Sequence, residues 1–109
     1  MKKWIIKFHP LFEKEFGEYS EEVQTELVAR AKILADFGPA KGRPQIDTLN
    51  GSKHKNMKEL RFDADDGVWR IAFAFDPKQE AVLLVGGDKS GKGSSDKFYK
   101  KLLKKADSR

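Results

Sequence analysis

The sequence contains no cysteine among its 109 residues. This absence excludes disulfide bonds, thiolate metal ligands and cysteine nucleophiles together. Long apolar segments are also missing: no run approaches the roughly 18 residues needed to span a bilayer, and residues 1–3 do not lead into the apolar stretch of a signal peptide. We therefore expect a cytoplasmic protein whose chemistry depends on oxygen and nitrogen groups.

Histidine is scarce, and the common nucleotide-binding and hydrolase motifs are missing. His9 and His54 lie in separate segments, and neither has the i,i+4 partner of a helical zinc site. The segment from Gly86 to Lys92 superficially resembles a phosphate loop, but its glycine-to-lysine spacing is wrong. No nucleophile elbow surrounds a serine. We expect neither a metal nor a cofactor, and we expect His9, directly before a proline, to be structural.

The composition is that of a folded chain. Hydrophobic residues make up 39% and charged residues 36%, and eight phenylalanines are available for burial. The length is close to the common size of one domain, and the composition shows no break. We therefore expect residues 1–109 to form a single domain.

The net charge of +5 is unevenly distributed along the chain. Acidic residues gather in the first third, whereas basic residues gather in residues 41–61 and again in residues 89–105. An anionic partner would meet the two basic segments. For any single lysine, solubility of the surface is the simpler explanation, so only the clustering favours a binding function.

Hydrophobic spacing predicts a strand and two helices in the first part of the chain. Residues Trp4 to Phe8 are rich in isoleucine and aromatic residues and predict a short strand. A short helix is expected from Leu11 to Tyr19. Ser20 is a good N-cap for a second helix, whose apolar stripe ends at Gly38.

The second part predicts a small sheet and a final helix. Residues Ala40 to Ser52 show no period and are expected to form a connecting loop. Three antiparallel strands are expected at 58–62, 68–75 and 81–85, and Gly86-Gly87 is expected to loosen the following connection. Ser94 or Ser95 would cap a C-terminal helix. The fold class is therefore α+β, with a small antiparallel or mixed sheet, two N-terminal helices, one C-terminal helix and the order β-α-α-β-β-β-α.

Cationic side chains on neighbouring strands form the strongest candidate site. The turn at residues 63–67 sets Arg61 roughly opposite Arg70, so two guanidinium groups would share one face of the sheet. Like charges at that distance need an anion, and the planar fork of arginine suits a phosphate. The flanking lysines that would contact or stabilise this anion are Lys53, Lys55, Lys58, Lys89, Lys92 and Lys97.

RNA could be cleaved at such a site, because RNA supplies its own nucleophile. A 2′-hydroxyl that attacks the adjacent phosphate needs only proton removal, charge stabilisation and protonation of the leaving oxygen. Cationic and phenolic side chains can provide these functions, and His54 is a further acid/base candidate.

Structural explanations remain open for each member of this site. Arg61 could pair with Glu59 or Asp63, and Arg70 could be neutralised by an acidic residue of a loop. Tyr99, at helical spacing, is as readily a core residue as a catalytic one. The aspartates of residues 63–66 could suggest Mg²⁺, but next to a glycine between two strands they more often form a turn.

Several short motifs resemble the RelE/HigB family of toxins, in a HigB-like subgroup derived from phage. They are Leu49-Asn50-Gly51, Met57 to Arg61 (MKELR), Gly67 to Ile71 (GVWRI), Val82 to Gly87 and Lys89. The resemblance covers nearly the whole chain, and the pair of ELR and WRI segments is its most specific part. The order of predicted elements agrees with it.

This resemblance implies the toxin of a toxin–antitoxin pair, an endoribonuclease that cleaves mRNA in the ribosomal A site. Arg61 and Arg70 match the family's phosphate-facing arginines, and Lys89 matches its basic residue after the last strand. Tyr99 matches a C-terminal tyrosine that some members use, whereas other members use histidines, for which His54 could substitute. The implied partner is a cognate antitoxin, often of helix-turn-helix type, and Glu59 matches a structural position.

Two other functions also fit the charge pattern. In the first, the same basic face of the sheet binds nucleic acid or an acidic protein segment without catalysis. In the second, the chain is a toxin-like protein that has lost its activity. Turnover on programmed ribosomes distinguishes the enzyme from both alternatives.

Overall fold

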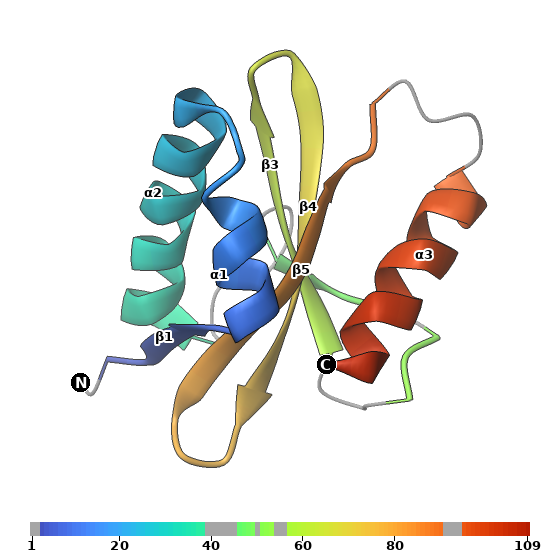
Figure 1. Ribbon diagram of the computed structural model, residues 1–109. Coiled ribbons are helices and arrows are strands. Elements are labelled where there is room, and N and C mark those ends of the chain that lie inside the picture. The colour runs from blue at the N-terminus through green and yellow to red at the C-terminus, as the bar shows by residue number, and fades with distance from the viewer. Residues whose placement is uncertain (1–2, 39–45, 50, 54–56, 91–94) are drawn as a thin grey trace.

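The computed structural model describes residues 3–38, 46–49, 51–53, 57–90 and 95–109. Its elements are β1 (Ile5–Phe8), α1 (Pro10–Phe16), α2 (Glu21–Phe37), β2 (Ile46–Thr48), β3 (Met57–Ala64), β4 (Gly67–Asp76), β5 (Glu80–Asp88) and α3 (Ser95–Ser108). The five strands form one sheet in the order β1-β5-β4-β3-β2, in which β1 is parallel to β5 and the other pairs are antiparallel. Helices α1 and α2 cover one face of this sheet, and α3 covers the other (Figure 1). The predicted α+β class with a mixed sheet is confirmed.

The sequence patterns did not predict one strand, β2. Ile46–Thr48 lies inside the segment expected to be a loop, but it pairs with β3 as an edge strand, with Ile46 opposite Leu60. The loop prediction is therefore wrong for these residues. Three residues are too few to show a period of two, and the strand depends on burial of Ile46, which is 6% exposed.

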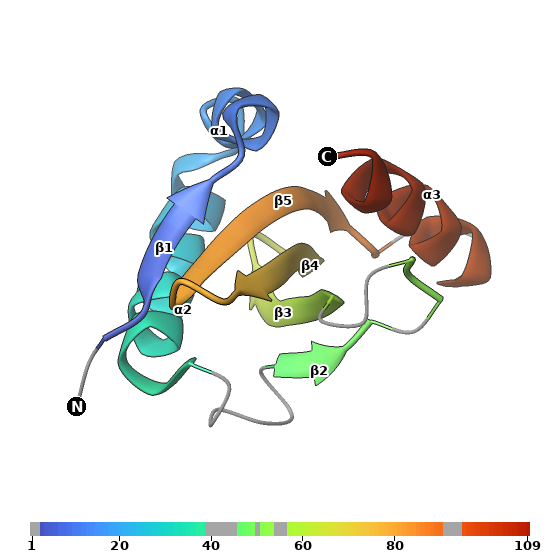
Figure 2. The same ribbon diagram turned by 90° about the horizontal axis from the view of Figure 1, so that it is seen from below.

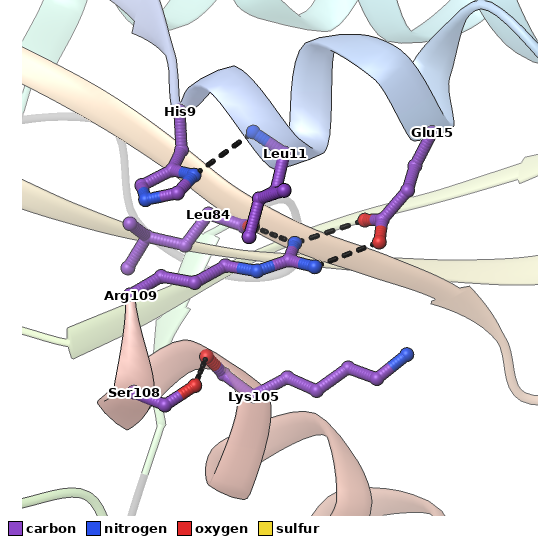
Figure 3. A network of polar contacts seen from close by, with 7 residues as sticks. All are labelled: His9, Leu11, Glu15, Leu84, Lys105, Ser108 and Arg109. Atoms are coloured by element: carbon purple, nitrogen blue, oxygen red, sulfur yellow. Dashed lines mark hydrogen bonds and ion pairs between the residues drawn. The ribbon is translucent and has the colours of Figure 1, made fainter.

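Helix α2 begins where the sequence predicts, and α1 begins at Pro10, one residue before the predicted start at Leu11. The Oγ of Ser20 accepts a hydrogen bond from the backbone N–H of Val23, so the predicted cap of α2 is confirmed. The Nδ1 of His9 accepts from the N–H of Leu11 at 3.1 Å, which confirms a structural role for this histidine (Figure 3). Helix α1 ends at Phe16, before the predicted end at Tyr19.

The β3–β4 hairpin sets the register of the central strands. Asp65 and Asp66 form its turn with φ of +50° and +58°, a left-handed conformation that aspartate tolerates better than most residues. The turn interpretation of this acidic segment is therefore confirmed. With this turn fixed, Arg61 lies directly opposite Arg70.

Two hydrophobic clusters lie on opposite faces of the sheet. The cluster under α1 and α2 includes Phe12, Leu27 and Phe73, each with no exposed surface. A smaller cluster under α3 includes Leu102 and Ala106 of that helix. Figure 2 shows the curved sheet between the two helical layers. The smaller cluster holds α3 against β4 and β5, so that side chains of this helix meet side chains of the sheet.

Strand β5 is longer than predicted, because it continues through Gly86 and Gly87 to Asp88. These glycines do not loosen the chain. A Cβ at Gly86 would lie 2.6 Å from Cδ1 of Ile71, and a Cβ at Gly87 would lie 3.0 Å from the ring of Phe98. Neighbouring side chains occupy the space that a larger residue would need, and the strand remains paired with β4.

Candidate functional site

The face of the sheet that α3 covers carries both arginines of the predicted site. Arg61 and Arg70 are cross-strand partners, and Arg70 also pairs in register with Gly87 of β5. The Arg70 side chain is 7% exposed, whereas that of Arg61 is 29% exposed. The predicted juxtaposition of the two arginines is therefore present, with one guanidinium buried and the other reaching solvent.

Glu59 lies between the two arginines. Its Oε1 is 3.3 Å from Nε of Arg70 and 3.7 Å from Nε of Arg61. The pairing of Arg61 with Glu59 had remained an open structural alternative. Here the same carboxylate faces both arginines, and its side chain is only 8% exposed. Charges that are buried in this way stabilise a protein only when they are paired.

Tyr99 of α3 completes the arrangement from the opposite layer. Its hydroxyl donates to Oε1 of Glu59 at 3.0 Å, so the tyrosine is both packed on the smaller cluster and bonded to the site. Burial raises the pKa of Tyr99 above 10.0, a hydrogen bond with Arg70 acts in the opposite direction, and the charge of Glu59 raises it further. The phenol therefore stays protonated at neutral pH in this structure.

Lys89 lies over the ring of Tyr99. Its Nζ is 5.5 Å from the ring centroid, and its backbone N–H donates to the carbonyl of Val68 at 2.7 Å. The carboxylate of Asp88 accepts from the N–H groups of Val68 and Ser90 at 3.0 and 2.9 Å. This fixed end of β5 directs Lys89 toward the tyrosine.

The site carries more positive charge than its carboxylate balances. The carboxylate of Glu59 faces Arg61 and Arg70, and the neutral phenol ring of Tyr99 adds the ammonium of Lys89 to the same group. The Nε of Arg70 lies within ion-pair distance of that carboxylate, yet it is a buried donor with no aligned hydrogen-bond acceptor. An excess of cations and an unsatisfied buried donor are the features of a site that takes an anion.

Of the remaining predicted residues, the three that the structure describes, Lys53, Lys58 and Lys97, form no contact with this group that the structure records. Lys58 follows the alternation of β3 onto the face covered by α1 and α2, where its Nζ donates to Oγ1 of Thr48 at 3.1 Å. Lys97 is an exposed residue of α3. The backbone N–H of Lys53 donates to Asp107 near the end of α3. Residues that lie outside the described ranges are His54, Lys55 and Lys92.

A second polar network fixes the C-terminal end of α3 (Figure 3). Two guanidinium nitrogens of Arg109 donate to the carboxylate of Glu15 in α1, at 2.9 and 2.7 Å, and one of them also donates to the carbonyl of Leu84 at 2.6 Å. This bond lowers the pKa of Glu15 and outweighs the effect of burial. Sequence reasoning missed this contact, because the partners are separated by almost the whole chain.

In the described ranges, no three histidine, aspartate or glutamate side chains gather as metal ligands. Of the helices that the structure describes, none has the length and apolarity to cross a membrane.

The family model "Phage derived protein Gp49-like (DUF891)" matches residues 14–109. The chain belongs to this family. This Gp49-like protein is also similar to HigB2 and HigB3 of Mycobacterium tuberculosis (strain ATCC 25618 / H37Rv), two proteins named as candidate toxins. The predicted resemblance to a HigB-like, phage-derived group is therefore confirmed.

The similarity to HigB2 is 45% identity over 84 residues, which is 75% of this Gp49-like chain and 41% of HigB2. For HigB3 the identity is 42% over 82 residues, or 75% of this chain and 70% of HigB3. The chain thus spans less than half of HigB2 and more than two thirds of HigB3.

Proposed function

We propose that this Gp49-like protein is the toxin of a toxin–antitoxin pair and an endoribonuclease that cleaves mRNA on the ribosome. The observation that carries this proposal is the pair of arginines on the α3 face, where Arg61 and Arg70 share one carboxylate and Tyr99 and Lys89 complete the group. The names of the relatives HigB2 and HigB3 support the toxin assignment. We further propose that the protein acts in the cytoplasm and is inhibited by a cognate antitoxin, of helix-turn-helix type.

In this proposal, the two arginines hold the scissile phosphate. Guanidinium groups bind phosphate oxygens with paired, charge-assisted hydrogen bonds, and they stabilise the extra charge of a pentavalent phosphorane. Lys89 is close enough to Tyr99 to face the same phosphate. These groups suit an attack by the 2′-hydroxyl of the RNA itself, a reaction in which the protein needs to supply only charge and proton transfer.

The remaining lysines and His54 have a secondary place in this proposal. Lys53, Lys55, Lys92 and Lys97 would contact the RNA backbone or the ribosome away from the scissile bond. Lys58 lies on the other face of the sheet, beside the edge strand β2. It would contact the RNA only where the bound strand runs around this edge, away from the scissile phosphate. His54 remains a candidate for proton transfer.

Arg61→Gln tests the proposal. Arg70 is a poor choice for this test, because its removal takes the nearer cation from the buried Glu59 carboxylate, and breaking a buried pair costs about 3 to 5 kcal/mol of stability. Arg61 is more exposed, so its replacement by glutamine should leave the thermal transition nearly unchanged. On programmed ribosomes the rate of mRNA cleavage should fall about 100-fold or more.

Arg30→Gln is the matched control for this variant. Arg30 of α2 also has a side chain that is 29% exposed and one carboxylate partner, Glu26, but α2 covers the face of the sheet opposite to α3 (Figure 1). This variant should retain the cleavage rate and the growth arrest of the parent protein. Equal losses in both variants would reject the assignment of Arg61.

The parent protein itself decides between an enzyme and a binding module. Expression without the antitoxin should arrest growth, and 5′-end mapping of mRNA should reveal new ends within translated codons. Binding to ribosomes or RNA without new ends would overturn the enzymatic proposal and favour the non-catalytic alternative. An adjacent reading frame for a helix-turn-helix protein would support the proposed antitoxin.

A further inference from the structure

Glu59 is the one buried carboxylate in the part of the chain that the structure describes. Taking a carboxylate out of water is costly, so its position needs a physical reason. A single oxygen, Oε1, meets three groups: the Tyr99 hydroxyl, Nε of Arg70 and Nε of Arg61. Packing alone does not require this convergence, because the adjacent cross-strand partner of Glu59 is an alanine, Ala72.

The contact with Glu59 sets the direction of the Tyr99 hydrogen bond. An ionised carboxylate can only accept, so the phenol proton points toward Oε1 of Glu59. The phenol oxygen then presents lone pairs, and no proton, to its other neighbours. Toward a bound RNA, Tyr99 is thus an acceptor for the proton of a hydroxyl group, whereas the leaving oxygen must be protonated by another residue.

Glu59 also competes with any bound phosphate for the two arginines. Its charge can balance only one of the two guanidinium groups, and Nε of Arg70 is not aligned with it. A phosphate that binds to the arginines would take over part of this pairing. The carboxylate would then be free to hold a proton at the moment when the RNA reacts.

We propose that Glu59 is a positioning residue that acts through Tyr99, holding both arginines until RNA binds and then taking the phenol proton as Tyr99 accepts the proton of the attacking 2′-hydroxyl. This inference rests on the proposed ribonuclease function. It assigns the proton acceptor to the Tyr99–Glu59 pair and leaves protonation of the leaving group to Lys89, whose ammonium lies beside the Tyr99 ring.

The step is balanced in bonds and protons. The O–H bond of the 2′-hydroxyl breaks, its proton passes to the Tyr99 oxygen, and the phenol's own proton passes to Oε1 of Glu59. The 2′-oxygen bonds to phosphorus while the bond from phosphorus to the 5′-oxygen breaks, which leaves a 2′,3′-cyclic phosphate. The 5′-oxygen takes a proton from Lys89, and exchange with water then restores Lys89 and Glu59.

Glu59→Gln, which keeps the shape of the side chain but removes its charge, provides the first test. The chain has two tyrosines, so a Tyr19→Phe background leaves Tyr99 as the only group in a spectrophotometric tyrosine titration. Loss of the Glu59 charge should lower the pKa of Tyr99 relative to the background protein, because that carboxylate raises it. An unchanged titration would overturn the proposed coupling between the two residues, and this readout requires no enzymatic activity.

The second test separates binding from chemistry on programmed ribosomes. Glu59→Gln should lower the single-turnover cleavage rate by about 100-fold, the usual effect of losing a proton acceptor. Its affinity for an uncleavable 2′-deoxy mRNA should be unchanged or tighter, because a competing negative charge has been removed. A loss of affinity with a normal cleavage rate would contradict the inference.

Asp63→Asn is the matched control, since it removes one negative charge from an exposed residue of the same strand. Its Tyr99 titration and cleavage rate should equal those of the parent protein. If Glu59→Gln shows no cooperative thermal transition, Glu59→Asp keeps the charge but withdraws it by one methylene, and full activity of that variant would reject the inference. If the parent protein cleaved no mRNA, the proposed ribonuclease function would be rejected. The titration would still test the coupling between Tyr99 and Glu59 independently.

Discussion

At the scale of single residues, the bond between Glu15 and Arg109 makes the protein's stability depend on pH. The Arg109 guanidinium holds the pKa of Glu15 below its ordinary value of 4.5. A carboxyl whose pKa is lower in the folded state stabilises that state above the ordinary value, and this contribution is lost as the pH falls through the folded value. The contact should therefore be fully formed at pH 7 and weaken in acid below 4.5.

We expect Glu15→Gln to lower the free energy of unfolding by about 1 kcal/mol at pH 7, because the pair is only partly shielded from water. The difference from the parent protein should shrink as the pH falls below 4.5. Thermal unfolding over this pH range measures both effects. Glu13→Gln, at an exposed position of the same helix, is the control; a constant difference across the range would contradict the interpretation.

The residues of the candidate site show what a sequence can predict about a site. The alternation of side chains and the acidic turn were enough to place Arg61 opposite Arg70. The same alternation also places Glu59 on their face, and that signal was available. The convergence on one oxygen atom of Glu59 was not predictable, because Tyr99 reaches it from a helix whose docking depends on the whole smaller cluster.

At the scale of elements, local signals predicted the helices and the hairpin better than the edges of the sheet. Ser20 and the acidic turn act within a few residues, so their consequences could be read directly. Strand β2 and the end of β5 depend instead on distant partners. Ile46 is held by burial against β3, and Gly86 is held by side chains from β4 and from the segment after α1.

The packing at Gly86 predicts that this end of β5 is intolerant of side chains. A Cβ there would lie 2.6 Å from Ile71 and 2.7 Å from the hydroxyl of Tyr19. We expect Gly86→Ala to lower the free energy of unfolding by about 1 to 3 kcal/mol, as measured by chemical denaturation.

Gly17→Ala is the control for this substitution. Gly17 has φ of −61°, and a Cβ there would lie no closer than 3.4 Å to the carbonyl of Lys14. Its replacement by alanine should leave the stability unchanged or raise it by up to about 1 kcal/mol. If both substitutions lowered the free energy of unfolding equally, the loss at Gly86 would not come from a clash of the added Cβ with its neighbours, and the packing explanation would be rejected.

At the scale of the whole molecule, the sheet separates regions of opposite charge. Helices α1 and α2 carry most of the acidic residues of the first third, whereas α3 carries a series of lysines on the other side (Figure 1). The uneven charge along the sequence thus becomes an uneven charge between two faces. A polyanion would approach the α3 face, where the candidate site lies.

This arrangement predicts a defined salt dependence of RNA binding. Each phosphate that is neutralised on a single strand contributes about −0.7 to the slope of log affinity against log salt, so three cations give about −2. The affinity for a 2′-deoxy mRNA without ribosomes measures this slope, which should become shallower in Arg61→Gln and stay constant in Arg30→Gln. A slope near zero would contradict binding through the arginine pair.

The parallel pairing of β1 with β5 has a consequence for the order of folding. Ile5 is paired with Glu80, and Phe8 with Leu83, whereas the β3–β4 hairpin joins residues that are close in the chain. Strands that are close in the chain pair quickly, whereas distant strands pair slowly because closing a long loop costs conformational entropy. During synthesis, β1 must therefore wait for β5, and the sheet that supports the candidate site cannot be completed until Asp88 at the end of β5 has left the ribosome.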